Sequence, residues 1–329
     1  HDVDGIGIRF DNWVSESEIL SHGKTKAVIE RLRKAGVVQK KEGAEWFVPS
    51  PVAGAEALED RESVLVRSTG EPTYFANDIA YHVDKFERGY DHLIDIWGAN
   101  HHAHIFRIRA ALVALGYRPE QFEVILYQYV RVKRGDEAVK MSKRAGDFVT
   151  AREVLDEVGK DAFRFFLLAR SASSHLDFDL DLAKKQSSEN PVYYIQYAHA
   201  RICSLLEKGR EKGVVVDSLK VDLTKINLPE EIELIRSLHD FPFELQTAIL
   251  NREPNRIPYY LVELARFLQF YYSRAKEDSR YHILSQPIDT AAAKLYLLRH
   301  VRDVLREGLS LLGVSAPERM QSLEESKDE

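Results

Sequence analysis

The chain has 329 residues, of which 44% are hydrophobic and 30% are charged, and its formal net charge is −6. This length allows two domains with a substantial core, and the acidic total argues against a general nucleic-acid coat while leaving room for local basic patches. The only cysteine, Cys203, excludes a disulfide framework or a cysteine-based zinc site within the chain and fits a reducing cytoplasm. We expect no signal peptide and no membrane association, since no apolar stretch is long enough to cross a bilayer.

The first 150 residues are expected to form an α/β unit with a parallel sheet. Strands are predicted at 7–13, 37–39, 45–48, 63–67, 92–97 and 122–132, and helices at 21–36, 73–86 and from the 98–102 turn to 115. Alternation of strands and helices indicates a parallel sheet, in which ligands bind at the carboxyl ends of the strands. A nucleotide is therefore expected near 98–102 and 140–146.

The chain after residue 150 is expected to be all helical. Thr150 and Glu153 form a predicted capping box, and Asn190 is predicted to cap a helix that begins at Pro191. Further amphipathic helices are predicted at 230–250, 258–277 and 290–312, which together indicate an antiparallel bundle. The predicted domains are 1–150, a helical connector at 151–189, a helical domain at 190–320 and a disordered tail at 321–329.

Tyr74 and Asp78 are four residues apart and therefore share one face of the predicted helix. A carboxylate beside a phenol can hold a cation, and a planar guanidinium is the strongest partner. The alternative is a solvated Asp78 and a core Tyr74.

Asn100, His101, His102 and His104 follow the strand predicted at 92–97. Metal binding is disfavoured, because adjacent histidines rarely point at one ion and no cysteine is close. Neutral imidazoles at the start of a helix fit phosphate or ribose contacts better, although capping alone is also open.

The run Lys140-Met141-Ser142-Lys143-Arg144-Ala145-Gly146 carries two lysines around a small hydroxyl residue. Such a loop can bring ammonium groups to nucleotide phosphates, where positioning and charge stabilisation drive phosphoryl and nucleotidyl transfer. The alternative is a solvated basic loop.

The helical part carries two further patterns. The acidic alternation between His175 and Asp181 fits a helix cap at Asp179 or Asp181 better than a cation site. Aromatic and polar side chains along the helix after Pro191, with Tyr271 and Tyr272 on another helix, suit unstacked RNA bases or a core with satisfied hydroxyls.

These segments together resemble bacterial arginyl-tRNA synthetases, which are class I aminoacyl-tRNA synthetases. The lysine run is similar to the family's KMSKS loop, with Arg144 in place of the final serine. The other supporting runs are 64–68, Pro72-Thr-Tyr-Phe-Ala-Asn-Asp-Ile-Ala-Tyr81, Trp97-Gly-Ala-Asn-His-His102, Asn190-Pro-Val-Tyr-Tyr-Ile-Gln-Tyr-Ala-His-Ala-Arg201 and 312–320. The resemblance runs from about Gly7 to Met320.

The resemblance implies the second half of a Rossmann-type catalytic domain followed by a helical anticodon-binding domain. It implies ATP-dependent activation of L-arginine, with Mg²⁺ arriving with the substrate, and transfer of arginine to tRNA(Arg), typically only with tRNA bound. The implied catalytic residues are Lys140, Ser142 and Lys143. Those for arginine are Tyr74, Asp78 and His102, and those for ATP are Gly98, Asn100, His101, Met141 and Lys143. The implied anticodon contacts are Tyr194, Gln196, Tyr272 and Met320.

The sequence also departs from the family. Asn100 and Ala103 replace an acid and a glycine of the usual Gly-Ala-Asp-His-His-Gly run, which puts a ribose contact in doubt, and Asn77 stands where arginine is frequent. The HIGH motif and the N-terminal tRNA-elbow domain lie outside this sequence. We therefore expect a C-terminal portion, monomeric and inactive alone. The alternatives are a tRNA-binding module without catalysis and another small nucleotidyltransferase.

Overall fold

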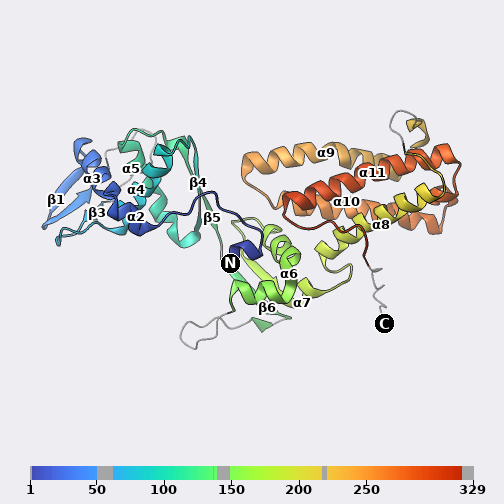
Figure 1. Cartoon of the computed structure of the whole chain (residues 1–329), viewed down its shortest axis with the longest axis horizontal. Coiled ribbons are helices and arrows are strands. Elements are labelled where there is room, and N and C mark those ends of the chain that lie inside the picture. The colour runs from blue at the N-terminus through green and yellow to red at the C-terminus, as the bar shows by residue number, and fades with distance from the viewer. Residues whose placement is uncertain (1, 50–61, 136, 139–148, 217–220, 321–329) are drawn as a thin grey trace. The chain divides into compact units, whose positions relative to one another are not determined.

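The computed structural model describes residues 2–49, 62–135, 137–138, 149–216 and 221–320. The chain divides into two compact units (Figure 1): the small unit is Phe10–Tyr129, and the large unit joins His1–Arg9 to Val130–Glu329. The predicted lysine run and the predicted disordered tail lie outside the described residues. No helix in the described ranges is long and apolar enough to cross a membrane.

The small unit contains two short sheets and their covering helices. Its elements are α2 (Glu16–Ser21), α3 (Lys24–Lys34), β1 (Val38–Lys41), β2 (Ala44–Phe47), β3 (Ser63–Val66), α4 (Tyr74–Glu87), β4 (Leu93–Gly98), η1 (Ala99–His101), α5 (His102–Ala114), η2 (Pro119–Gln121) and β5 (Phe122–Tyr127). β1, β2 and β3 form an antiparallel sheet, whereas β4 and β5 pair in parallel from Leu93↔Phe122 to Gly98↔Tyr127. Helices α3, α4 and α5 pack their apolar faces into one core around Leu32, Leu65 and Ile79.

Three predicted strands differ from the structure. Residues 7–13 contain no strand: Gly7 lies in the turn after α1 with a left-handed φ of 76°, and residues 8–13 pair with no strand of the described chain. The strand from Ser63 pairs antiparallel with β2 rather than joining the parallel pair. The segment 122–132 is two strands, because its first part pairs with β4 and its second part pairs with a strand of the large unit.

The large unit is mainly helical. Its elements are α1 (Asp2–Gly5), β6 (Val130–Arg134), β7 (Glu137–Ala138), α6 (Ala151–Leu168), β8 (Leu176–Asp179), α7 (Leu180–Lys184), α8 (Pro191–Glu211), η3 (Leu223–Lys225), α9 (Pro229–Asn251), α10 (Arg256–Ser273), η4 (Arg274–Lys276), η5 (Ser279–Tyr281), η6 (Ile283–Ser285) and α11 (Ile288–Leu311). The long helices α8, α9, α10 and α11 pack side by side (Figure 1) around buried apolar residues such as Ile195, Leu264 and Leu298. The predicted order of an α/β region followed by a helical region is confirmed.

Local hydrogen bonds explain where the helices begin. Thr150 and Glu153 form the predicted capping box at α6, and Asn190 caps α8 before Pro191. The helix cap predicted at Asp179 or Asp181 is confirmed at Asp179. Its carboxylate accepts hydrogen bonds from the backbone N–H groups of Asp181 and Leu182, both over 3.0 Å, at the start of α7.

Gly313, which follows Leu312 after the end of α11, packs against a partly buried junction. Arg164 on α6 donates from Nε to the carbonyl of Leu312 over 2.6 Å and from a terminal nitrogen to the carbonyl of Ile6 over 2.9 Å. Gly313 has a φ of 69°, and a Cβ atom there would lie 2.5 Å from Arg164 Nε. Gly313→Ala combines backbone strain with loss of this junction, so we expect it to lower the free energy of unfolding by about 2 kcal/mol.

Gly213→Ala is the matched control for that measurement. Gly213 belongs to the same unit and has a φ of 76°, but apart from its chain neighbours no atom of the described residues lies within 4 Å of the position that a Cβ atom would take there. The substitution therefore introduces backbone strain alone. Thermal unfolding should show a clearly larger loss for Gly313→Ala, and equal losses would contradict a role for the arginine junction.

Candidate functional site

The first site lies at the start of α4. Thr73 caps this helix by accepting from the N–H of Ala76 over 3.4 Å, and its hydroxyl donates to the carbonyl of Val64 over 2.6 Å. The cap therefore fastens the helix start to β3. The next residue, Tyr74, is 64% exposed, so its phenol is available to a ligand.

Asp78 lies one turn after Tyr74, and a buried histidine holds its carboxylate. His104 on α5 bonds Asp78 Oδ2 through Nε2 over 2.9 Å. The His104 ring packs against Phe75 and Trp97, with centroids 5.8 and 5.5 Å apart, and against Tyr74 at 6.1 Å. Oδ1 has no hydrogen-bond partner among the described residues, and the side chain is 44% exposed. One oriented carboxylate oxygen is therefore open to a cationic ligand.

A second histidine fixes the backbone of Asp78. His82 lies between the carbonyl of Asp78, 2.6 Å from Nδ1, and Asp95 Oδ2 on β4, 2.8 Å from Nε2. Both ring nitrogens face acceptors, so the ring satisfies both bonds when it is doubly protonated. Burial raises the pKa of Asp95, but the His82 hydrogen bond and the charges of His82 and Lys85 outweigh it and hold that pKa below its usual range.

The carboxyl end of β4 provides the second group of predicted residues. A Cβ atom at Gly98 would lie 2.7 Å from Asn100 Oδ1, so the glycine allows the asparagine side chain to fold back against the strand end. Tyr127, the parallel partner of Gly98, ends β5 at the same edge. The His101 ring lies 6.4 Å from the Trp97 ring, which also packs on His104. The structure therefore brings Gly98, Asn100 and His101 to the same end of the small unit as Tyr74, Asp78 and His104, which together we call the Asp78 cluster.

His102 does not join this cluster. Its ring packs against Phe106 on its own helix, with centroids 5.4 Å apart, while His104 makes the bond to Asp78. No group of three histidine, cysteine, aspartate or glutamate side chains in the described ranges is placed to hold a metal ion. Lys140, Met141, Ser142 and Lys143 lie outside the described residues.

Sequence reasoning missed the roles of Trp97, His82 and Asp95, and it grouped His104 with its neighbours without assigning it a partner. One signal was present for His104, which shares a helix face with the buried residues Ile108 and Ala111. A histidine on an apolar helix face needs a polar partner inside the fold. The identity of that partner depends on how α4 and α5 pack.

The second site is an aromatic and basic pocket of about 230 Å³ in the large unit. Tyr272 on α10 stacks against the guanidinium of Arg201 on α8, which lies 4.1 Å from the ring centroid. The Tyr272 hydroxyl is buried without a hydrogen-bond partner among the described residues. The other lining residues are Ser204, Leu205, Lys208, Tyr281 and Ile283, and no described carboxylate lines the pocket. An aromatic face beside cations suits a single unstacked base with its phosphate.

The other predicted anticodon residues are not gathered in that pocket. Gln196 is buried and donates to Asp161 and to the carbonyl of Ser315, both over 2.9 Å, so it joins α8 to α6 and to the chain after α11. Tyr194 is half-buried, and burial raises its pKa against the charge of Arg266. Met320 is half-buried at the end of the described chain.

His199 lies one turn after Gln196 and ties down the same C-terminal segment. Its Nδ1 donates to the carbonyl of Pro317 over 2.9 Å. Burial lowers the pKa of this imidazole, although the bond to Pro317 acts in the opposite direction. A neutral ring suits a structural contact that holds the segment leading to Met320.

Two family models match the chain. The model described as tRNA synthetases class I (R), catalytic domain, matches residues 3–172, and the model described as DALR anticodon binding domain matches residues 195–320. The first match contains the Asp78 cluster, and the second contains the Tyr272 pocket.

Similar proteins agree with these matches. An arginine–tRNA ligase of Syntrophotalea carbinolica is 46% identical over 320 residues, which is 97% of this chain and 56% of that relative. One of Heliobacterium modesticaldum is 45% identical over 97% of this chain and 55% of its own length. A solved structure described as an arginyl-tRNA synthetase of Campylobacter jejuni superposes with a TM-score of 0.84 at 32% identity, covering 97% of this chain and 66% of that one. The chain spans about half the length of the curated relatives it matches.

Proposed function

Because the chain belongs to the arginyl-tRNA synthetase family of class I aminoacyl-tRNA synthetases, we propose that it takes part in attaching L-arginine to tRNA(Arg). The reaction has two steps. Arginine and ATP, which brings Mg²⁺, condense to arginyl-adenylate and pyrophosphate, and the arginyl group then passes to the terminal adenosine of the tRNA. The working state that we propose is a cytoplasmic monomer.

The observation that carries the proposal is the oriented, half-open carboxylate of Asp78. His104 holds one oxygen, His82 holds the backbone, and the other oxygen is open beside the exposed phenol of Tyr74. The guanidinium of arginine is a planar donor that matches a fixed carboxylate, whereas the ammonium of lysine is a point charge. This arrangement supports Asp78 as the group that selects arginine, with Tyr74 beside it. The third predicted residue, His102, lies outside the Asp78 cluster and gains no support from it.

The ATP site that we propose combines the end of β4 with the lysine run. Gly98, Asn100 and His101 would contact the nucleotide, and Met141 and Ser142 would pack and bond beside it. Lys140 and Lys143 would stabilise the charge that develops on the leaving pyrophosphate. These side chains supply positioning and positive charge, which is most of what nucleotidyl transfer requires of a protein.

The helical bundle would read the anticodon. Tyr272 offers a stacking face backed by Arg201, and its buried hydroxyl has no hydrogen-bond partner among the described residues. Burial raises the pKa of Tyr272, so the hydroxyl stays protonated at neutral pH. Tyr194, Gln196 and Met320 would complete the surface, with Gln196 acting through the contacts that hold 314–320.

The test is a titration of this chain with an arginine tRNA and with the same tRNA carrying a changed middle anticodon base, at two salt concentrations. We expect the base change to weaken binding by about tenfold, because a base-edge partner left unpaired costs roughly 1–3 kcal/mol and about 1.4 kcal/mol corresponds to a factor of ten. Raising the salt should weaken both complexes, because phosphate contacts release counterions. Weak binding that is indifferent to the base would contradict anticodon recognition by residues 190–320.

A further inference from the structure

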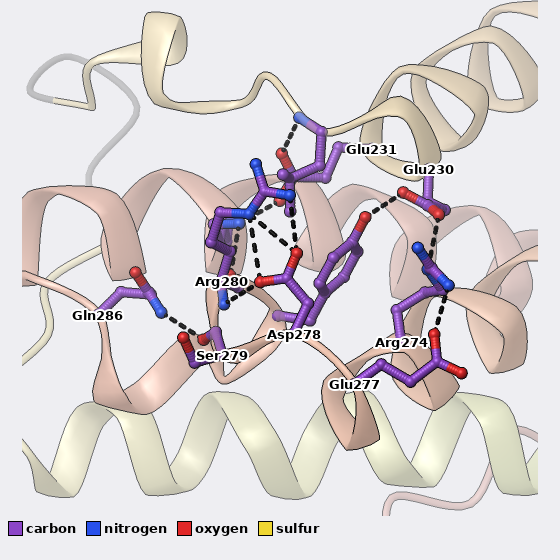
Figure 2. Close-up of polar contacts among 11 residues, drawn as sticks. Glu230, Glu231, Arg274, Glu277, Asp278, Ser279, Arg280 and Gln286 are labelled. Carbon is purple, nitrogen blue, oxygen red and sulfur yellow. Dashed lines mark hydrogen bonds and ion pairs between the residues drawn. The ribbon is translucent and has the colours of Figure 1, made fainter.

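A buried ion pair lies behind the aromatic pocket. Lys294 on α11 donates to Glu231 on α9 over 2.6 Å, and the two side chains are 4% and 0% exposed. Neither residue lines the pocket. Figure 2 shows Glu231 within a network that connects α9 to the turns after α10.

Glu231 joins the start of α9 to α10. Its Oε2 accepts from the backbone N–H groups of Asn227 and Leu228 over 2.9 and 3.0 Å, which caps the helix. Its Oε1 accepts from the hydroxyl of Tyr271 over 3.1 Å. Tyr271 is the neighbour of Tyr272 on α10, with ring centroids 5.9 Å apart. The carboxylate therefore anchors the residue beside the stacking face.

Lys294 anchors the turn that carries another lining residue of the pocket, Tyr281. Its ammonium donates to the carbonyl of Arg280 over 3.1 Å, within the turn η5. The next residue is Tyr281, whose ring lines the pocket and packs edge-on against Tyr271 with centroids 5.4 Å apart. The Tyr281 hydroxyl also donates to Glu230, and the Arg280 guanidinium pairs with Asp278 (Figure 2). The backbone of η5 is thus held by the buried Lys294, and its side chains are held by Glu230 and Asp278.

Stability alone is a weak explanation for such a pair. Taking two charges out of water costs several kcal/mol per ion, and replacing a buried pair with uncharged side chains of similar volume is often neutral or stabilising. The charged pair also fixes positions. Because Glu231 accepts from the Tyr271 hydroxyl and Lys294 donates to the Arg280 carbonyl, the ion pair holds these two groups beside each other.

We propose that Glu231 and Lys294 are positioning residues for RNA recognition, which fix Tyr271 and η5 and so set the separation of Tyr272 and Tyr281 across the pocket. The inference rests on the proposed function, because its ligand is the arginine tRNA. It assigns discrimination between bases to two side chains that RNA does not touch.

The test variant is Glu231→Gln/Lys294→Met. The glutamine oxygen can still accept from Asn227 and Leu228, and its amide can face the Tyr271 hydroxyl, so the cap of α9 remains. The methionine fills the space of the lysine stem without its donor. The net charge is unchanged, and the bond lost without replacement is the one to the Arg280 carbonyl. If methionine does not pack, Glu231→Gln/Lys294→Leu is the second variant.

The matched control is Lys225→Met/Asp289→Asn. This pair lies in the same helical bundle, 3.5 Å apart, but its side chains are 40% and 57% exposed. The control also removes one positive and one negative charge. It does not touch the pocket or η5.

Each protein is titrated with the arginine tRNA and with its middle-base variant, after its melting temperature is measured. Hydrogen exchange over residues 279–285 provides a readout that does not depend on RNA. We expect the buried-pair variant to keep its fold, to exchange faster in that turn and to lose about tenfold in discrimination between the two tRNAs. The control variant should discriminate as the unmodified chain does.

Equal discrimination by the buried-pair variant and the unmodified chain would overturn the inference and leave the proposed function standing. Unchanged exchange over 279–285 would also overturn it. Failure of the unmodified chain to discriminate would instead contradict the proposed anticodon recognition by residues 190–320, and the inference with it.

Discussion

Asp78→Ala is expected to abolish measurable arginine binding. The guanidinium would lose its carboxylate while remaining in a site shaped for a cation, and breaking a desolvated charge pair costs on the order of 3–5 kcal/mol. This corresponds to a loss of affinity of at least about a hundredfold. Calorimetry with L-arginine, in the presence of the arginine tRNA, measures the effect directly.

Glu87→Ala is the control for that experiment. Glu87 ends the same helix, is exposed, and pairs with Arg31 on α3. Its removal changes the net charge by the same amount without touching the Asp78 cluster. Arginine affinity that survives Asp78→Ala, or that falls equally in Glu87→Ala, would remove Asp78 from the role of arginine ligand.

Lys294→Met alone should be the most destabilising substitution among those considered. It leaves Glu231 charged, completely buried and without its cation, which costs about 3–5 kcal/mol. For a unit of this size the melting temperature should fall by roughly 10 °C. Adding Glu231→Gln should recover most of the loss, because no uncompensated charge remains.

The exposed pair gives the comparison for this second experiment. Lys225→Met removes an ammonium of the same kind from Asp289, but an exposed pair contributes about 0–1 kcal/mol. Urea unfolding should therefore give Lys294→Met a much lower free energy of unfolding than either Glu231→Gln/Lys294→Met or Lys225→Met. A Lys294→Met protein as stable as Lys225→Met would show that Glu231 is not left as an uncompensated charge in the core of the bundle.

The features that the sequence predicted well depend on neighbours along the chain. Thr73, Thr150 and Asn190 all cap helices as expected, because a cap bonds N–H groups two or three residues away. Tyr74 and Asp78 share a face because helix geometry requires it.

The features that the sequence did not predict depend on distant partners. The segment 122–132 has no internal mark of a break, and it divides because its two halves pair with β4 and β8. Gln196 points inward because of Asp161 and Ser315, which lie 35 and 119 residues away. The choice of His104 over His102 likewise depends on how α5 packs against α4. Hydrophobic spacing indicates which face of a helix is buried, but it does not indicate which side chains of other elements contact that face.

The guanidinium of Arg164 has a consequence for the order of events during translation. It bonds the carbonyl of Ile6 and the carbonyl of Leu312, so the large unit needs segments from both sides of the small unit. The small unit is continuous and leaves the ribosome long before Leu312 is made. It can therefore fold as synthesis proceeds, while residues 2–9 wait for partners far along the chain. The nascent protein should thus form the contacts around Asp78 before the junction of Ile6, Arg164 and Leu312 can close.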